Sequence, residues 1–331
     1  MAGKLPFERI KRELFVRKKA KTDPKFGNNP NERPVPELLN FGVVNINKPK
    51  GPTSHQVSAY LQKILGVAKG GHSGTLDPKV TGVLPVAVGR GTRIVQALLP
   101  AGKEYVCIMH LHKEVDEKKI KSAMKKFVGR IKQLPPLKSA VKRQERYRKV
   151  YYINILEIEG KDVLFVVGCQ AGTYIRKLCH DIGVSLGTGA HMAELVRTKA
   201  GPFTDKDMVT LQDVADALSY FKEEKNEKFI RHCIKPIEFA ASHLPKVFVL
   251  DTTVDTLCHG ADLKVPGISM AESEIQVGDI AAIMTLKGEL VAIGTAKMIS
   301  KDMVKKEKGV AVTTDKVFMI PGTYPKIQKS D

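Results

Sequence analysis

The chain has 331 residues, enough for two or three domains, and 43% of them are hydrophobic, which excludes a disordered chain. A formal net charge of +19 at pH 7 predicts a polyanionic partner. Residues 113–149 contain fourteen Lys or Arg against four Asp or Glu, whereas residues 245–331 contain eleven of each. We therefore expect a phosphate-binding surface mainly on the first two thirds of the chain.

Cysteine spacing and hydropathy exclude several other classes. The five cysteines are scattered without a CxxC pair, so neither a zinc site nor a redox dithiol is expected. We expect buried free thiols in a reducing compartment instead. The N-terminus lacks an apolar signal core, and no apolar run approaches the ~20 residues that span a bilayer. These features predict a soluble, intracellular protein.

The N-terminal segments predict an arm, a strand and a helix. Residues 1–37 are polar, basic and proline-containing, which indicates an extended arm, and the first strand follows at residues 41–46. The turn at residues 47–54 can end in a helix cap supplied by Thr53 or Ser54. Apolar residues at helical spacing then lead to a glycine at position 66, where a helix typically ends.

The run GHSGTLDPKVTGVL at residues 71–84 places one acidic residue, Asp77, between a glycine-rich approach and a proline. The proline disfavours helical geometry at Asp77. Gly71, Gly74 and Gly82 let the backbone turn sharply and let another molecule approach closely. From these residue types alone, a substrate-binding loop and a simple polar turn are about equally good interpretations.

The middle of the chain alternates between helical and strand patterns. A strand is expected near residues 105–111 and a helix from about residue 116. Residues 149–159 and 163–167 flank a Gly-Lys-Asp turn, which predicts a β-hairpin. Strands separated by helices, with hairpins between them, favour an α+β domain over a doubly wound one.

Tyr105 and a basic segment after it are candidates for nucleic-acid binding. An aromatic ring stacks on any nucleobase, worth roughly 1–3 kcal/mol per base, although a lone strand tyrosine is more often simply half-buried. In residues 135–148, two prolines and Tyr147 stand among basic residues, which favours RNA binding over a merely solvated face. These basic residues are Lys138, Lys142, Arg143, Arg146 and Arg148.

Arg176 is a second candidate for chemistry. After an apolar strand, Gly172 turns the chain and Thr173 can cap a helix with a buried aliphatic face. Arg176 then lies in the first helical turn, where its guanidinium and the backbone N–H groups form a site for an anion. That anion can be a phosphate or the carboxylate of Asp77, and Arg176 alone also fits a plain surface residue.

The C-terminal third predicts a small β-barrel. Short strands are expected near residues 247–250, 279–286 and 290–298, with a helix at residues 251–258. A linker to this unit is expected at residues 239–244.

Taken together, these stretches resemble the motifs of the TruB/dyskerin family of RNA pseudouridine synthases, and the C-terminal unit resembles a PUA domain. The resemblance runs from about residue 41 to residue 325, and its length, PUA domain and lack of a lysine-rich tail are most similar to the archaeal branch. The matching catalytic stretches are residues 47–54, 71–84, 102–105, 169–183 and 195–203, and the PUA stretches are residues 258–263 and 318–325.

The resemblance implies an α+β fold with three parts. These are a basic N-terminal arm at 1–37, a catalytic domain at 38–240 with a mixed, mainly antiparallel sheet, and a PUA β-barrel at 245–325. Within the catalytic domain, residues 138–150 are expected to form a mobile loop that clamps RNA.

The activity that the resemblance implies is isomerisation of uridine to pseudouridine in RNA, which requires the base to leave its stack. Asp77 would act as nucleophile or take part in elimination of the glycosidic bond, and Arg176 would hold its carboxylate. Tyr105 would stack on the uracil, and Tyr174 would pack on the other side and help to move the C5 proton. The family's chemistry needs neither a metal nor an organic cofactor.

Four further residues receive supporting roles from the resemblance. Lys48 would brace the catalytic loop through backbone carbonyls, although a plain strand-to-helix connection also explains its motif. His72 would fill the space of the flipped base, with a packed or capping histidine as the alternative. Leu195 would form an apolar wall, and Arg197 would contact a phosphate. We group all four with the residues expected to contact RNA.

The archaeal and eukaryotic branch resembles the catalytic subunit of box H/ACA guide ribonucleoproteins. The implied partners are a guide RNA, substrate rRNA and tRNA, a GAR-type β-barrel protein, a short zinc-ribbon protein and a kink-turn-binding ribosomal-type protein. Guide-free modification of the tRNA T-loop is a second implied activity. The location would be the cytoplasm of an archaeon, or the nucleolus of a eukaryote.

Two alternatives from other classes remain at this point. One is a non-catalytic RNA-binding scaffold of a ribonucleoprotein. The other is a nucleotide-binding enzyme that uses residues 89–93, GRGTR, as a phosphate loop, although this string lacks the Gly-Lys-Ser/Thr ending of a P-loop.

Overall fold

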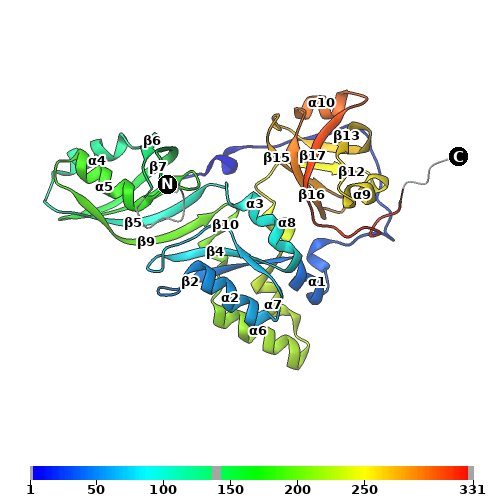
Figure 1. The fold of residues 1–331 in the computed structure, drawn as a ribbon, viewed down its shortest axis with the longest axis horizontal. Helices are drawn as coiled ribbons and strands as arrows, with labels where there is room; N and C mark the ends of the chain where they lie inside the picture. Colours follow the sequence, from blue (N-terminus) through cyan, green and yellow to red (C-terminus); the bar gives the residue numbers. More distant parts are fainter. Residues whose placement is uncertain (1–2, 136–142, 327–331) are drawn as a thin grey trace.

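The computed structural model describes residues 3–135 and 143–326. Figure 1 shows a larger body built on a ten-stranded sheet and a smaller body built on a seven-stranded sheet. Helices cover both bodies, so the predicted α+β class is confirmed. Within the described ranges, no helix is both long and apolar enough to cross a membrane.

The large sheet is mixed and mainly antiparallel, as predicted. Its main path runs β11-β2-β4-β9-β5-β8-β7-β6, and β4 and β9 form its parallel pair. The short strands β3 (Gly70–His72) and β10 (Phe203–Thr204) pair with β4 and β9 off this path. The bounds of the path strands are β11 (Ile234–Pro236), β2 (Gly42–Lys48), β4 (Thr81–Val88), β9 (Ala190–Ala200), β5 (Lys103–Leu111), β8 (Asp162–Cys169), β7 (Arg146–Glu159) and β6 (Gly129–Gln133).

Two helices flank the Asp77 loop. The sequence predicted the ends of the first helix correctly but not the N-terminal cap of the second. Helix α2 (Ser54–Leu65) starts with a capping box between Thr53 and Gln56 and ends at Gly66, whose φ of 66° is left-handed, as predicted. Helix α5 (Ile175–Ser185) has Tyr174 as its N-cap without a side-chain cap. The predicted cap, Thr173, instead donates its hydroxyl hydrogen bond to the Gln170 carbonyl, 2.7 Å away.

Two hydrophobic cores meet at this loop. One core fills the space between β5, β7, β8 and the helices α4 (Glu117–Lys125) and α5, at the left of Figure 1. The other lies where β2 and β4 pack against α2, α6 (Leu211–Glu224) and α7 (Glu227–Cys233), at the bottom of that view. Leu76 and Val80, on either side of Asp77, belong to the first core, whereas Leu84 belongs to the second.

The smaller body follows the predicted pattern of short strands around one helix. Its sheet order is β1-β14-β12-β15-β16-β17-β13, and the predicted helix at residues 251–258 is α9 (Asp251–Cys258). The remaining elements are β12 (Lys246–Val249), β13 (Leu263–Lys264), β14 (Ile268–Glu272), β15 (Ile280–Met284), β16 (Leu290–Ala296), α10 (Ser300–Lys305) and β17 (Val310–Val317).

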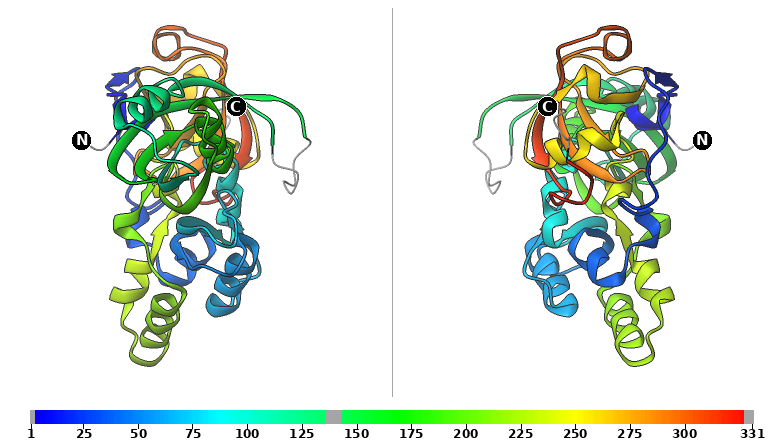
Figure 2. Two further views of the ribbon diagram at one scale, coloured as in Figure 1. Left: turned by 90° about the vertical axis from the view of Figure 1, so that its left-hand side faces the viewer. Right: turned by 90° about the vertical axis from the view of Figure 1, so that its right-hand side faces the viewer.

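The basic N-terminal arm is part of both bodies. Leu5 is fully buried, and Glu8 pairs with Lys199 of β9 at 3.1 Å. The chain then adds β1 (Leu14–Val16) antiparallel to β14, at the edge of the smaller sheet, before it returns to helix α1 (Val35–Asn40). The dark blue segment beside the smaller body in Figure 2 is this N-terminal arm. It therefore ties the two bodies together.

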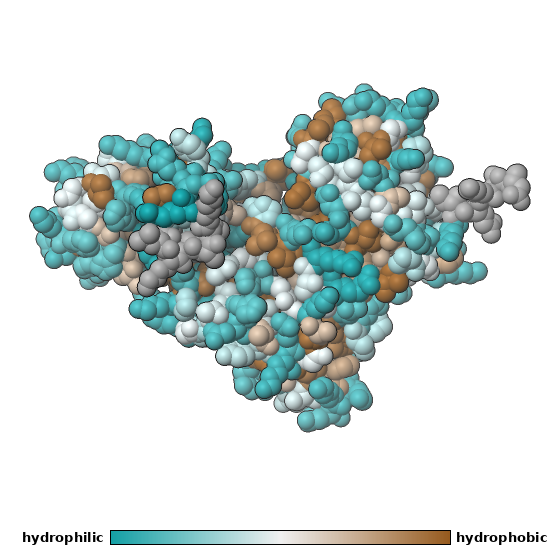
Figure 3. Space-filling model, viewed as in Figure 1, coloured by the Kyte–Doolittle hydropathy of each residue, from teal (hydrophilic) through white to brown (hydrophobic). Residues whose placement is uncertain are grey.

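The expected linker at residues 239–244 connects the two bodies, but most of it is packed between them instead of exposed. Residues at the end of α8 (Ile237–Ala240) and after it are buried, and Leu244 lies in one apolar core with Phe203 of the larger body and Phe318 of the smaller one. Buried apolar contact of this kind fixes the two bodies relative to each other. On the face in Figure 3, the mainly hydrophilic surface is interrupted by apolar patches where the bodies meet.

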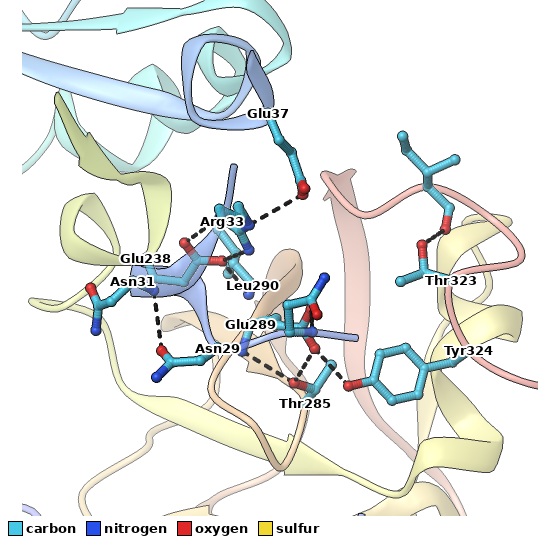
Figure 4. Close-up of polar contacts among 12 residues, drawn as sticks. Asn29, Asn31, Arg33, Glu37, Glu238, Thr285, Glu289, Leu290, Thr323 and Tyr324 are labelled. Carbon is cyan, nitrogen blue, oxygen red and sulfur yellow. Dashed lines mark hydrogen bonds and ion pairs between the residues drawn. The ribbon is translucent and has the colours of Figure 1, made fainter. Parts of the chain in front are cut away.

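A polar cluster closes this junction on the side of the arm, as Figure 4 shows. Arg33 donates two hydrogen bonds to Glu238, of 2.7 and 2.9 Å, and Glu238 also accepts from the backbone N–H of Leu290 at 2.9 Å. Burial alone would lower the pKa of Arg33, but the hydrogen bond and charge of Glu238 raise it above its ordinary value. Beside it, Glu289 accepts from the Tyr324 hydroxyl at 2.6 Å.

Replacing Arg33 by Met should destabilise the whole chain. Glu238 would remain buried without its cationic partner, and such a loss costs about 3–5 kcal/mol in the free energy of unfolding. Denaturant unfolding followed by circular dichroism measures the change. The double variant Arg33→Met/Glu238→Gln should recover at least half of the loss, because the buried charge is gone. Equal stability of the single variant and the wild type would contradict this role.

Candidate active site

Asp77 lies in the loop between β3 and β4, where it pairs with Arg176. The ion pair joins Nη2 of Arg176, in the first turn of α5, to Oδ2 of Asp77. The side chains are 54% exposed for Asp77 and 56% for Arg176, so the pair faces solvent instead of the core. Of the two anions that the sequence left open for Arg176, the structure shows the carboxylate.

The loop that carries Asp77 is held by the buried ammonium group of Lys48. Its Nζ donates to the backbone carbonyls of Pro49, Pro78 and Val80 at 2.8, 3.1 and 2.9 Å. Burial lowers the pKa of Lys48, and the charge of Asp77 opposes this shift. Because the side chain of Lys48 is fully buried, grouping it with the residues that contact RNA is wrong.

Ser54 holds the same loop from the other side. Its hydroxyl accepts from the backbone N–H of Leu76 at 2.8 Å and donates to the Leu76 carbonyl at 3.2 Å. The backbone N–H of Gly51 donates to the Pro78 carbonyl at 2.9 Å. The residues directly before and after Asp77 are thus bonded to the end of β2 and the start of α2. The cap itself is Thr53, which leaves Ser54 free for this contact.

Arg197 does not face RNA phosphates. Its side chain is 1% exposed, and it donates to the carbonyls of Val83 at 2.6 Å and Gly74 at 3.2 Å. The prediction of a phosphate contact is therefore wrong, and Arg197 instead joins β9 to the strand and loop on either side of Asp77. At Gly82, φ is 99° and a Cβ atom would lie 2.3 Å from the Arg197 carbonyl oxygen, so this close approach requires glycine.

Tyr105 and Lys103 lie on the strand beside Arg197. Tyr105 is half-buried and is paired in register with Arg197. Burial raises the pKa of its hydroxyl, against the effect of the Arg197 charge, and the charge of Asp77 raises it further. Lys103 is almost fully buried and donates to the carbonyls of Leu98, Leu99 and Ala101. Burial, together with the Arg197 charge, lowers the pKa of Lys103 to about 7.

Leu195 and His72 complete the surroundings of the loop. Leu195 is 8% exposed and belongs to the same core as Leu76 and Val80. His72 ends β3 and is half-buried, and burial, followed by the charges of Arg197 and His55, lowers its pKa. A neutral imidazole is consistent both with a wedge for a flipped base and with a packed histidine, so its role stays a prediction.

The predicted RNA-clamping residues fall into two groups. Lys138 and Lys142 lie outside the described residues, whereas Arg143 is exposed just before β7. Arg146 and Arg148 are half-buried at the start of that strand. Arg148 packs beside Gly172, in the turn that leads to α5. In Figure 2, the adjoining ends of β6 and β7 project away from the body.

Comparison with known proteins gives concordant matches. Residues 62–175 match the N-terminal domain of the TruB family pseudouridylate synthases, and residues 176–242 match the C-terminal domain of tRNA pseudouridylate synthase B. Residues 245–318 match a PUA domain, and residues 3–58 match the DKCLD (NUC011) domain. The probable tRNA pseudouridine synthase B of Methanopyrus kandleri is 56% identical over 98% of this chain and 95% of its own length. The chain belongs to the TruB family.

Two solved structures extend the similarity to the whole fold. The structure of a Cbf5-Nop10-Gar1 complex has a chain that is 56% identical, with a TM-score of 0.94 over 98% of both chains. A chain in an H/ACA RNP bound to a substrate RNA that contains 2′-deoxyuridine is 52% identical, with a TM-score of 0.92 over 98% of this chain and 100% of that one. The family and the C-terminal PUA domain that the sequence motifs indicated are thus confirmed.

Gln133 is a residue at the site that sequence reasoning missed. It ends β6, is 2% exposed, and makes two hydrogen bonds to the backbone of Tyr174. Its Oε1 accepts from the Tyr174 N–H at 3.0 Å, and its Nε2 donates to the Tyr174 carbonyl at 3.1 Å. Gln133 therefore caps the start of α5, two residues before Arg176. No local pattern around Gln133 marks this role.

Replacing Lys48 by Met should remove the ammonium donor from the carbonyls of Pro49, Pro78 and Val80. The Pro78 carbonyl keeps the N–H of Gly51 as a second donor. Unsatisfied buried carbonyls cost about 1–3 kcal/mol in the free energy of unfolding. A displaced Asp77 should lower the single-turnover rate of pseudouridine formation about 100-fold. Lys50→Met is the matched control, because Lys50 is exposed and pairs with Glu194. A rate equal to that of the control would contradict the bracing role.

Replacing Gln133 by Met should remove the two hydrogen bonds that hold the start of α5. The Arg176 guanidinium should then shift relative to Asp77, although the residue itself is still present. We expect the rate of pseudouridine formation to fall about tenfold, with RNA affinity unchanged. In the Arg176→Ala background the same change should have little further effect, because both act on one contact. Gln170→Met is the control, since the Gln170 side chain bonds the Lys149 N–H. Additive losses in the double variant would show that Gln133 acts independently of Arg176.

Proposed function

We propose that this chain converts uridine to pseudouridine in RNA, with Asp77 as the catalytic group. The observation that carries the proposal is the Asp77–Arg176 pair on a loop whose backbone is bonded on both sides of the carboxylate. A fixed, solvent-facing carboxylate suits attack on a bound ligand, because its position is set before the ligand arrives. The relatives at 56% identity are named probable tRNA pseudouridine synthase B.

The proposed reaction exchanges one bond of the target nucleotide for another. The target base is first flipped out of its stack. Asp77 either attacks C1′ or assists elimination, so that the N1–C1′ bond breaks and the uracil carries the electron pair away. The uracil then turns within the pocket. On the attack route, C5 bonds to C1′ as the Asp77–C1′ bond breaks and the carboxylate leaves; on the elimination route, C5 bonds to C1′ as C2′ regains the proton that Asp77 had removed. The proton on C5 is lost while N1 gains one. This series of reaction steps needs neither an oxidant nor a cofactor.

The neighbouring side chains have distinct proposed roles in this reaction. Tyr105 stacks on the uracil, and its half-buried ring is already held on β5 beside the loop. Tyr174 packs on the other side, at the start of α5, and helps to move the C5 proton. Leu195 supplies an apolar wall, which excludes water from the base while it is detached. Arg176 keeps the carboxylate aimed at the sugar.

We further propose that the chain works within a box H/ACA guide ribonucleoprotein. The similar Cbf5 chain is in a complex with Nop10 and Gar1, and another similar chain is in an H/ACA RNP with substrate RNA. Equivalent small proteins, a kink-turn-binding protein and a guide RNA are the proposed partners. Because the named relatives are tRNA pseudouridine synthases, guide-free modification of a tRNA T-loop is proposed beside it. The archaeal relatives favour a cytoplasmic location.

The RNA grip is proposed to come from the basic segment around the start of β7. Arg143, Arg146 and Arg148 among the described residues, together with Lys138 and Lys142, would contact backbone phosphates. The exposed Tyr147 ring is partnered on one side, because the Arg130 guanidinium lies 3.9 Å from its centroid. Because the basic side chains of this segment would neutralise phosphates and release their counterions, the affinity for RNA should fall steeply as the salt concentration rises.

Asp77→Asn tests the catalytic role against a non-catalytic scaffold. The substitution keeps the shape of the side chain, and the bonds that hold the loop go to backbone atoms. We expect no pseudouridine from the variant, with RNA affinity within about threefold of wild type. The measurement uses radiolabelled uridine in target RNA, with guide RNA and partner proteins and again on bare tRNA.

Asp181→Asn is the matched control for this experiment, because Asp181 lies on α5, the helix that carries Arg176, but pairs with Lys177 instead of Arg176. The control should retain full turnover. Equal activity of Asp77→Asn and wild type would rule out the proposed mechanism. Firm RNA binding without turnover by the wild type under both conditions would instead favour the scaffold.

A further inference from the structure

A β-bulge lies in the large sheet beside Tyr105. On β5, Glu104 is paired in register with Lys199 of β9. The next residue of β5, Tyr105, is paired with Arg197, so Thr198 is an extra residue in β9. A bulge of this kind bends its strand and re-aims side chains, and bulges are frequent next to active sites. The register of the sheet therefore shifts at the residue that is proposed to stack on the uracil.

The extra residue decides which side chains of β9 face the site. Paired residues on neighbouring strands share a face of the sheet, and a shift by one residue moves side chains to the opposite face. With the bulge, Arg197 lies opposite Tyr105, and Leu195 is buried in the core while Val196 is 37% exposed. Without the bulge, Thr198 would lie opposite Tyr105. Arg197 and Leu195 would then point to the other side of the sheet.

Glu104 holds the bulge from the face of the sheet opposite Tyr105. The residue is 6% exposed, and its Oε1 accepts from the Thr198 hydroxyl at 2.9 Å. The Nζ atom of Lys199 lies 3.6 Å from Oε2 of the same carboxylate. Side chains of a regular strand alternate between faces, whereas here two consecutive residues of β9 reach one carboxylate. The extra residue is thus fixed by a hydrogen bond of its own hydroxyl.

Tyr152 holds Glu104 in its turn. Both residues are paired with Gly168 of β8, Glu104 from β5 and Tyr152 from β7. A Cβ atom at Gly168 would lie 2.3 Å from the Tyr152 ring, so the ring crosses above this glycine, and its hydroxyl donates to Oε2 of Glu104. Burial, followed by this hydrogen bond, raises the pKa of Tyr152, so the hydroxyl keeps its proton and stays a donor.

The N-terminal arm covers this cluster. A Cβ atom at Gly3 would lie 2.2 Å from the Tyr152 ring, which shows how closely the arm approaches. Lys199 also pairs with Glu8 of the arm at 3.1 Å. Because Glu104 is shielded from water, its hydrogen bonds are stronger than they would be at an exposed position. The cluster is therefore a rigid support on the face of the sheet opposite the site.

We propose that Glu104 and Thr198 are positioning residues for pseudouridine formation. Their hydrogen bond fixes the bulge, and the bulge turns Arg197 and Leu195 to the face of Tyr105. The stacking ring, the apolar wall and the brace of the Asp77 loop are thereby brought to one side of the sheet. The inference rests on the proposed function, because it requires that the uracil binds against Tyr105.

The test compares two substitutions of Thr198. Thr198→Val removes the hydroxyl and keeps the branched shape of the side chain, whereas Thr198→Ser keeps the hydroxyl. Single-turnover rates of pseudouridine formation are measured on target RNA with guide RNA and partner proteins, at increasing concentrations of the full chain. Thr198→Val should lower the rate at saturation about tenfold, because the site residues are displaced by a fraction of an ångström. The concentration for half-maximal rate should stay within about twofold of wild type, and Thr198→Ser should stay within about threefold in rate.

Two further variants separate this hydrogen bond from other effects. Thr295→Val is the matched control, because the Thr295 hydroxyl donates to Asp315 at 2.9 Å across two strands of the PUA domain, and it should leave the rate unchanged. Glu104→Gln keeps an oxygen acceptor for Thr198 and an amide donor for the Tyr152 oxygen, but it removes the charge. Its rate should therefore stay within about threefold of wild type.

Amide hydrogen exchange gives a readout that does not depend on activity. Peptides that cover residues 194–200 should exchange faster in Thr198→Val than in wild type, because the bulge opens more often without its hydrogen bond. The same peptides should exchange at the wild-type rate in Thr198→Ser and in Thr295→Val.

Four outcomes would overturn the proposal. One is a wild-type rate in Thr198→Val, and another is an equal loss in Thr198→Val and Thr198→Ser, which would assign the effect to packing. The third is weaker RNA binding without a loss of rate at saturation, and the fourth is a tenfold loss in Glu104→Gln, which would assign the support to the ion pair. If the wild type forms no pseudouridine, the proposed function fails, and the exchange comparison separately shows whether Thr198 holds the bulge.

Discussion

The structure around Asp77 depends on one buried ammonium group. Lys48 ends β2 with its side chain out of solvent, and its three hydrogen bonds go to the carbonyl of Pro49 in its own turn and to those of Pro78 and Val80, which follow Asp77. Burial of a charge is costly unless every donor is satisfied, and here three carbonyls satisfy it. The loop thus cannot move without exposing that charge to an apolar core, which keeps the carboxylate in place.

Lys48 is one of three buried cations behind the loop. Lys103 and Arg197 are also nearly inaccessible, and each donates to backbone carbonyls instead of carboxylates. Burial lowers the pKa of all three groups, and the charge of Arg197 lowers the pKa of Lys48 and Lys103 further. The wall behind Asp77 is therefore positive, and it favours both the carboxylate and the phosphates of an approaching RNA.

The rigid site is attached to a rigid frame. The arm at the N-terminus adds β1 to the PUA sheet, and Arg33 then joins Glu238 at the junction of the two bodies. The apolar core that contains Leu244 and Phe318 continues across that junction. An RNA that touches both the Asp77 loop and the PUA domain thus meets two surfaces at a fixed separation.

Local signals in the sequence correctly predicted those helices whose ends are set by residues close to them in the chain. The cap at Thr53, the stop at Gly66 and helix α9 all follow from neighbouring residues, and the motifs around Asp77 and Arg176 indicated the family. The sequence did not predict the direction of a long side chain, since this depends on which strand packs beside it. Arg197 was therefore assigned to an RNA phosphate, although the sheet encloses it.

What the sequence alone determined is the family, the α+β class and the residues that carry the chemistry, because these follow from motifs and short-range periodicity. What only the tertiary structure decided is which groups meet. Gln133 reaches Tyr174 from 41 residues away, which no motif indicated. The pairing of Arg176 with Asp77, 99 residues away, was implied by the family resemblance and left open by the residues themselves. The burial of the linker at residues 239–244 was not predicted for the same reason, since it comes from segments of two domains. Contacts of this kind depend on packing between distant segments, which no local pattern encodes.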